Sequence, residues 1–207
     1  MNNRYFFLRH GRSIPNEKGF ICSTLTNGEK AENSLTPEGM KQIFQTGELL
    51  SNIVKIPKTY IFSSPFSRTL HSALILKQVL GLPHYKLTTN EKLIERNFGN
   101  FELQTSSNYD KVWNLDLEGK IFEGVESPIT VSVRINKFID DCESNYKDKD
   151  IIVVTHGDVI MIARTYFLGL SPFKHRDFPY VDNAQFLCFD NEFQKKFMEE
   201  TKDLYDF

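Results

Sequence analysis

Two apolar segments of the sequence each end in a histidine followed by a glycine. The first, at 5–8, leads into Arg9 and His10, and the second, at 151–155, leads into His156. A short apolar run of this kind is typical of a buried strand. In open α/β sheets the reacting groups collect at the carboxyl ends of the strands. The two histidines are therefore predicted to converge on one pocket.

A further cationic group, Arg68, is predicted in the first turn of a helix that Ser64 and Pro65 open. A cation is unfavourable at this positive end of the helix dipole, so the position makes sense if an anion binds beside it. Arg9 and Arg68 offer planar guanidinium groups that match phosphate oxygens, and histidine can act as a nucleophile or donor near neutral pH. Together these groups favour phosphoryl chemistry.

Other kinds of site match the sequence less well. A metal site would need carboxylates or thiolates beside the histidines, or a helical i, i+4 spacing, and neither pattern is present. The Gly-x4-Gly-Lys-Ser/Thr phosphate loop is absent, and no cysteine is followed by an arginine six residues later. We therefore expect a site that uses neither a metal nor a cofactor.

Predicted strands and helices alternate along the chain. Strands are expected at 5–8, 58–63, 151–155 and 185–189, and helices at 36–54, 64–80, 128–146 and 159–168. This alternation predicts an α/β fold of three layers, in which helices cover both faces of a central, mostly parallel sheet. The length fits a single domain over residues 1–207. The tail beyond residue 189 is expected to form a last helix or to fray.

Two segments interrupt the alternation. Residues 17–35 are polar and contain the turn signal Asn27-Gly28, so we expect a long solvated loop that borders the site. Residues 109–126 hold the lone Trp113 and are expected to form a short helix in an irregular segment over the sheet edge. The helix at 64–80 is expected to turn one stripe toward the core: Leu70, Ala73, Leu74, Lys77 and Leu80.

Four motifs follow one another along the chain. They are Leu8-Arg9-His10-Gly11-x-Ser13, Ser63-Ser64-Pro65-x-x-Arg68-Thr69, Glu95-Arg96-x-Phe98-Gly99 and Thr155-His156-Gly157. In this order they resemble the signature of the histidine phosphatase superfamily, whose fold is phosphoglycerate-mutase-like. Arg-His-Gly alone is a weak signal, whereas four motifs in the right order are a strong one.

The resemblance implies roles for the matched cationic residues. His10 would be the nucleophile that becomes phosphohistidine. Arg9, Arg68 and His156 would bind the oxygens of the phosphoryl group during transfer. These roles agree with the physics of phosphoryl transfer, which depends mainly on positioning and charge stabilisation, and a covalent intermediate divides the reaction into two steps.

The resemblance also implies an acid and a further phosphate contact. Glu95 would give a proton to the leaving alcohol and then take one from water, with Glu91 and Glu102 as the neighbouring alternatives. A carboxylic acid in this role needs burial to hold its proton near pH 7. Asn16, six residues after His10, matches a phosphate-contacting asparagine of the family. Three other histidines are expected to be ordinary surface or core residues: His71, His84 and His175.

The sequence departs from the mutases of this family. Residues 17–35 lack a Gly-Trp-Asp segment, and residues 100–126 contain Lys111 and Lys120 but no paired arginines for a substrate carboxylate. We therefore expect a metal-independent phosphomonoesterase of the phosphatase branch, acting on a small phosphorylated metabolite or on a phosphoprotein. Two alternatives are a phosphoglycerate mutase, which would need a bisphosphate primer, and a non-catalytic binding protein that keeps the fold.

Composition and charge limit the expected partners and location of the protein. The 207 residues carry a net charge of −2, so a nucleic-acid partner is not expected. Three scattered cysteines are too few for a disulfide framework, and the N-terminal apolar run is too short for a signal peptide. No stretch reaches the length of a membrane span. A cytoplasmic protein without a membrane partner is expected, and no feature predicts its oligomeric state.

Overall fold

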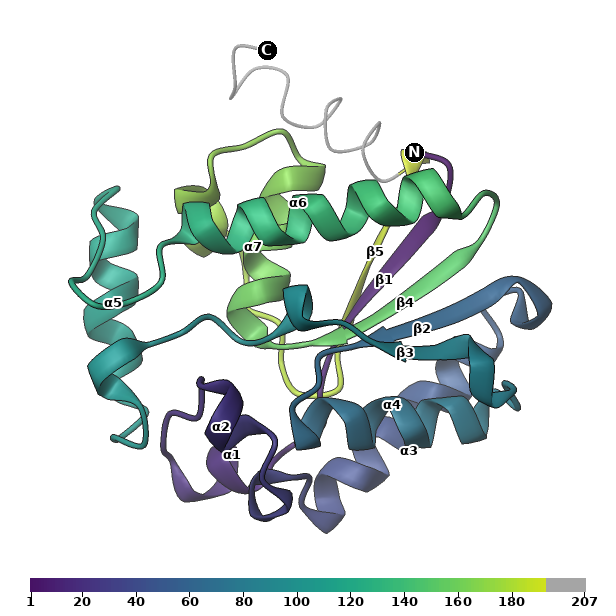
Figure 1. Cartoon of the computed structure of the whole chain (residues 1–207), viewed down its shortest axis with the longest axis horizontal. Helices are drawn as coiled ribbons and strands as arrows, with labels where there is room; N and C mark the ends of the chain where they lie inside the picture. The colour runs from purple at the N-terminus through teal and green to yellow at the C-terminus, as the bar shows by residue number, and fades with distance from the viewer. Residues whose placement is uncertain (193–207) are drawn as a thin grey trace.

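The computed structural model describes residues 1–192, and the remainder of the expected C-terminal tail lies outside this range. A five-stranded sheet forms the centre, in the order β3-β2-β4-β1-β5 (Figure 1). The strands are β1 (Arg4–Arg9), β2 (Thr59–Ser63), β3 (Leu87–Thr89), β4 (Asp150–Thr155) and β5 (Phe186–Phe189). All pairs are parallel except β1 with β5. The α/β fold with a mostly parallel sheet is therefore confirmed, and the short edge strand β3 is an addition to the prediction.

Helices cover both faces of the sheet (Figure 1), which explains why the middle residues of its central strands are apolar. The long helices are α3 (Pro37–Ser51), α4 (Ser67–Val79), α6 (Pro128–Asn145) and α7 (Gly157–Phe167). Successive side chains of a strand point to opposite faces. Tyr5 and Phe7 of β1 accordingly pack in one core with α6 and α7, and Phe6 and Leu8 pack in the other with α3 and α4.

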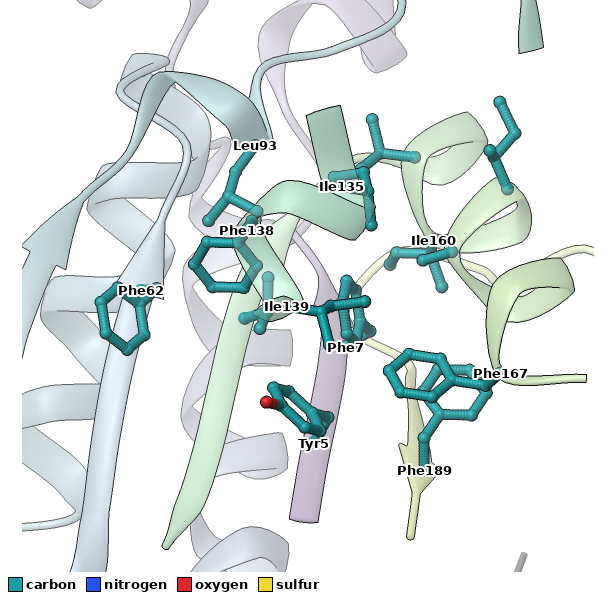
Figure 2. Close-up of a cluster of buried hydrophobic side chains, with 14 of the residues drawn as sticks. Tyr5, Phe7, Phe62, Leu93, Ile135, Phe138, Ile139, Ile160, Phe167 and Phe189 are labelled. Atoms are coloured by element: carbon teal, nitrogen blue, oxygen red, sulfur yellow. The ribbon is translucent and has the colours of Figure 1, made fainter. Parts of the chain in front are cut away.

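Aromatic rings pack together with aliphatic side chains in the core beneath α6 and α7 (Figure 2). Phe167 of α7 stacks on Phe189 of β5 with the ring centroids 4.3 Å apart, and Phe7 meets both rings edge-on at 5.8 Å. Such pairs contribute about 0.5–1.5 kcal/mol each beyond the burial of their area. This packing fixes α7 against β1 and so fixes His156, which lies directly before the helix.

Helix α4 differs from its prediction in both its start and its buried face. It begins at Ser67 rather than at Ser64, and no side chain caps it. Leu74 is 41% exposed, whereas Thr69 and Ser72 are fully buried. These two hydroxyls reach backbone carbonyls of the same segment, Ser72 that of Arg68 at 2.7 Å, so their burial leaves them hydrogen-bonded.

The segment at 17–35 was expected to be a solvated loop, and this prediction is wrong in part. It holds short helical turns and buries Ile21, Cys22 and Ser23. A carboxylate oxygen of Glu102 explains this path, because it accepts hydrogen bonds of 2.7 Å from both the backbone N–H and the hydroxyl of Ser23. The short helices of the structure are α1 (Ile14–Lys18), α2 (Leu25–Gly28), η1 (Ala31–Asn33), η2 (Ile56–Lys58), η3 (His84–Lys86), η4 (Glu91–Leu93), η5 (Gly99–Phe101) and η6 (Pro172–Arg176).

Helix α5 (Asn108–Leu117) is the short helix expected around Trp113, but its place is different. The indole N–H of Trp113 donates to Asp158 in the first turn of α7. The helix therefore covers the carboxyl end of the sheet and not its edge (Figure 1). No helix in the described range is both long and apolar enough to cross a membrane.

Candidate active site

Two neighbouring parallel strands deliver the two histidines. β1 and β4 pair in register with Arg9 opposite Thr155, so His10 and His156 follow at equivalent positions. The backbone N–H of His10 donates to the carbonyl of Thr155 at 3.1 Å. The imidazole centroids lie 5.4 Å apart, and both side chains are buried. The structure thus brings together the two residues that the sequence placed at strand ends.

The guanidinium of Arg68 lies between the two imidazoles. Its Nε donates to Nε2 of His10 at 3.1 Å, and its Nη2 lies 3.1 Å from Nδ1 of His156 and donates to the carbonyl of Cys22 at 2.9 Å. The remaining nitrogen, Nη1, is buried and has no hydrogen-bond partner in the described part of the chain. A buried cation with an unused donor is a site for an anion, because leaving that donor unpaired costs free energy.

The contacts of His10 fix its tautomer. Nδ1 lies 2.8 Å from the carbonyl oxygen of Gly11, which can only accept, so Nδ1 carries the proton and Nε2 keeps a lone pair. Burial, then the charges of Arg68 and Arg9, lower the pKa of His10 well below its usual range. The imidazole is therefore uncharged at neutral pH, and its nucleophilic atom is Nε2, whose lone pair accepts the hydrogen bond from Arg68 in this structure.

Gly11 lets the chain turn away from His10 without a clash. A Cβ at this position would lie 2.3 Å from the carbonyl oxygen of Gly39, at the start of α3. The backbone N–H of Gly11 donates to Ser72 of α4 at 3.2 Å. The nucleophile loop is thus held against both helices of this face.

His156 has a hydroxyl partner on its far side. Its Nε2 lies 2.9 Å from Oγ of Ser64, which follows β2. A hydroxyl can donate or accept, so Ser64 is compatible with either tautomer of His156. Burial and the neighbouring Arg68 lower the pKa of His156 well below its usual range. His156 can therefore present Nδ1 to Arg68 or to an anion, and Nδ1 also lies 3.8 Å from Oε2 of Glu95.

Glu95 is held by its backbone in the connection between η4 and η5. Arg134 of α6 donates to its carbonyl oxygen at 3.2 Å, and the backbone N–H of Arg96 donates to its Oε1 at 2.9 Å. Burial, then the negative charge of Asp158, raise the pKa of Glu95 to about 7. Glu95 thus holds its proton close to neutral pH, as a general acid requires.

The two alternative acids lie elsewhere. Glu91 is exposed. Glu102 accepts hydrogen bonds from the side chains of Ser23, Thr24 and Asn27 and so has a structural role in the segment at 17–35.

Arg9 and Asn16 lie at the edge of the same space. Arg9 donates from Nη1 to the carbonyl of Val181 at 2.9 Å, and its Nε is buried with no partner among the described residues. Oδ1 of Asn16 accepts from the hydroxyl of Ser13 at 2.9 Å and from the amide of Asn183 at 3.2 Å. Both residues remain placed to contact an anion beside His10.

One cavity of about 130 Å³ collects these groups. Five of the six predicted residues line it, and the sixth, His156, lies behind Arg68. The segment at 17–35 does border the site, as expected, through Phe20 and Cys22. Sequence reasoning missed the other residues of the lining: Ser13, Pro15, Phe98, Tyr109, Trp113, Asp158 and Tyr180.

Aromatic side chains form one wall of this cavity. Trp113 stacks on Tyr109 with the ring centroids 5.0 Å apart, and the guanidinium of Arg176 lies 3.9 Å from the centroid of Trp113. Tyr180 packs closely on the backbone of Gly157, where a Cβ would lie 1.9 Å from its hydroxyl oxygen. The position of the lone tryptophan and the glycine after His156 are the sequence signals that could have indicated this wall.

A family comparison decides the assignment. The model of the histidine phosphatase superfamily, branch 1, matches residues 5–203. The chain belongs to the histidine phosphatase superfamily. Among its curated relatives, the 2,3-bisphosphoglycerate-dependent phosphoglycerate mutase of Thermoplasma acidophilum is 28% identical over 79% of this chain and 76% of its own length. A probable phosphoglycerate mutase of Erwinia tasmaniensis is 24% identical over 80% and 74%, respectively.

Two solved structures of phosphatases share the fold. A mycobacterial glucosyl-3-phosphoglycerate phosphatase in complex with vanadate (VO3) superimposes with a TM-score of 0.74, 21% identity and coverage of 92% of this chain and 93% of the other. The phosphoserine phosphatase of Entamoeba histolytica in complex with 3-phosphoglyceric acid gives a TM-score of 0.72 and 22% identity, with 92% of each chain covered. At these identities the likeness establishes the phosphoglycerate-mutase-like architecture.

Proposed function

We propose that this protein is a phosphomonoesterase that works through a phosphohistidine at His10 and needs no metal. One observation carries the proposal: the lone pair of His10 Nε2 and the unpartnered donors of Arg9 and Arg68 border the cavity that Glu95 also lines. A nucleophile, an anion site and a proton donor are the three parts that hydrolysis of a phosphate ester through a covalent intermediate requires. A binding protein would have no use for an acid with a pKa of about 7 beside the anion site.

The proposed reaction has two steps. Nε2 of His10 attacks phosphorus, the bond from phosphorus to the ester oxygen breaks, and Glu95 gives its proton to the departing alkoxide. Water then attacks the phosphohistidine, Glu95 takes a proton from it, and the bond from phosphorus to Nε2 breaks to release inorganic phosphate. Arg9, Arg68 and His156 stabilise the charge on the phosphoryl oxygens in both steps.

The cavity favours a small substrate whose only strong anion is the phosphate. Among the lining residues that the structure describes, the cations are Arg9 and Arg68, and both lie beside the nucleophile. Glu95 and Asp158 line the same space, so a carboxylate on the leaving group would meet acids and aromatic rings there. Hydrolysis of a phosphorylated metabolite fits this lining better than phosphate transfer on a sugar acid, and the cytoplasm stays the expected location on the sequence grounds given above.

Phosphoglycerate mutase activity is the second candidate, because the two curated relatives described above are named as a phosphoglycerate mutase and a probable phosphoglycerate mutase. A panel of phosphate monoesters that includes 3-phosphoglycerate separates the two. With EDTA present, we expect inorganic phosphate from several small esters, and no 2-phosphoglycerate when a bisphosphoglycerate primer is added. Isomer formation that depends on the primer, without phosphate release, would identify a mutase. If chelation abolishes the activity and added divalent metal restores it, the protein does not use this mechanism.

A further inference from the structure

Asp158 is a buried acid in the cavity wall that the proposed reaction does not yet use. It lies in the first turn of α7, two residues after His156, and is 2% exposed. Both of its carboxylate oxygens lie 3.1 Å from the indole nitrogen of Trp113, which donates to them. Glu95 and Asp158 are the two carboxyl groups among the cavity-lining residues that the structure describes.

The cation nearest to Asp158 is shared with a second acid. Arg96 is fully buried and binds Asp116 through both Nη1 and Nη2, while its contact with Asp158 is one bond of 3.3 Å from Nη1. One guanidinium thus faces two carboxylates, so this cluster carries a net negative charge. His175 does not compensate for it, because burial lowers the pKa of that histidine and keeps it uncharged.

Glu95 experiences this excess charge because it lines the same cavity. A like charge nearby disfavours ionisation of a carboxyl group. The charged and titratable groups around Glu95 come from several packed elements: Arg9 of β1, His10, Cys22, Arg68 of α4, Tyr109 of α5, Arg134 of α6, His156 and Asp158 at the start of α7, and Tyr180. The cations of this set favour ionised Glu95, and Asp158 opposes them.

We propose that Asp158 is a positioning residue for the reaction: it keeps the proton on Glu95 and holds Trp113 in the cavity wall. The inference rests on the proposed function, in which Glu95 is the general acid. Burial and Asp158 are the causes that raise the pKa of Glu95 to about 7. Through Trp113, the same carboxylate fixes the aromatic side of the substrate space.

Two substitutions separate these effects. Asp158→Asn removes the charge but keeps an oxygen that can accept from Trp113, whereas Asp158→Ala removes both. In both variants we expect the basic limb of the kcat/KM profile to move to lower pH by about one unit, because removal of a nearby like charge lowers the pKa of a carboxyl group. KM should stay near the wild-type value in Asp158→Asn and rise several-fold in Asp158→Ala. Glu91→Gln, which removes an exposed charge four residues before Glu95, is the matched control and should leave the profile unmoved.

A titration without substrate keeps this test independent of catalysis. In protein with 13C-labelled glutamate carboxyl groups, the resonance of Glu95 is assigned by its loss in Glu95→Gln. We expect it to titrate at lower pH in both Asp158 variants than in wild type and in Glu91→Gln. If Glu95 titrates at the wild-type pH in both variants, the proposal is overturned even if the protein is a phosphatase. If neither variant folds, the proposal is also overturned, because Asp158 would then have a structural role. Absence of phosphatase activity in wild type would instead overturn the proposed function. The titration would still report the effect of Asp158 on the pKa of Glu95.

Discussion

At the scale of single residues, the proposed chemistry needs His10 uncharged and Glu95 protonated at the same pH. Burial serves both needs, because it disfavours whichever form is charged. It lowers the pKa of His10, where Arg68 and Arg9 act in the same direction, and it raises the pKa of Glu95 to about 7. The pH range between these two pKa values is the range in which both groups are in their reactive forms.

The role of Glu95 can be tested through the leaving group. Glu95→Gln keeps the shape of the side chain but cannot donate a proton, so phosphorylation by alkyl phosphates should slow by about 10²–10⁴-fold. A nitrophenyl phosphate releases a stable anion and should lose much less in this step. Burst kinetics separate phosphorylation from the later hydrolysis. A burst that is equally impaired with both esters, or a larger effect in Glu91→Gln or Glu102→Gln, would move the acid to another residue.

The same substitution should change how stability depends on pH. The folded-state pKa of Glu95 lies above that of a free glutamate, so the folded protein binds more protons between pH 4.5 and about 7. The free energy of unfolding of wild type therefore falls relative to that of Glu95→Gln as pH rises through this window. From pH 5 to 8 the variant should gain roughly 3 kcal/mol over wild type, by 1.36 kcal/mol per unit. Urea unfolding at both pH values measures this difference, and a constant difference would show that Glu95 is not perturbed.

At the scale of secondary-structure elements, Glu102 holds the segment at 17–35 in place by hydrogen bonds. This segment contributes Phe20 and Cys22 to the cavity wall. Glu102→Gln should destabilise the fold by about 1–3 kcal/mol, because its buried donors lose a charged acceptor. The substitution should also lower kcat/KM, because Phe20 and Cys22 in the cavity wall shift when the segment is held less firmly. Hydrogen bonds from Ser23, Thr24 and Asn27 outweigh the effect of burial and lower the pKa of Glu102.

The sign of the pH effect follows from that lowered pKa. The stabilisation by Glu102 is present above its unfolded pKa and is lost as pH falls through the folded one. Thermal melts of wild type and Glu102→Gln should therefore converge at low pH. Glu29→Gln, which changes an exposed acid within the same segment, is the control and should melt like wild type. Equal melting of Glu102→Gln and wild type at neutral pH would show that the segment is held by other contacts.

The elements differ in how far the sequence predicted them. Strand ends were predicted well, since an apolar run stops where the chain meets the site, as at Arg9 and Thr155. The buried face of α4 was predicted poorly. Periodicity counts apolar residues, whereas Thr69 and Ser72 are buried because local carbonyls satisfy their hydroxyls. Such local hydrogen bonds leave no periodic signal.

At the scale of the whole molecule, the parallel sheet explains why residues far apart in the sequence share one cavity. Strands β1, β2 and β4 end at the same edge and are followed by His10, Ser64 and His156. The order of the motifs therefore predicted that His10 and His156 lie close together, whereas Ser64 was expected only to open a helix. The aromatic wall could not be predicted in this way, because Trp113 and Tyr180 come from segments whose path depends on tertiary contacts such as that with Asp158. The single-domain organisation over 1–207 stays a prediction.

The most direct test of the account is to trap the phosphorylated enzyme. Wild type mixed with a 32P-labelled substrate and quenched within one turnover should carry label that is stable in base and labile in acid, and peptide mapping should place it on His10. His10→Ala should be folded, unlabelled and inactive. Label on another residue, or normal turnover by His10→Ala, would contradict the central claim that this histidine is the nucleophile.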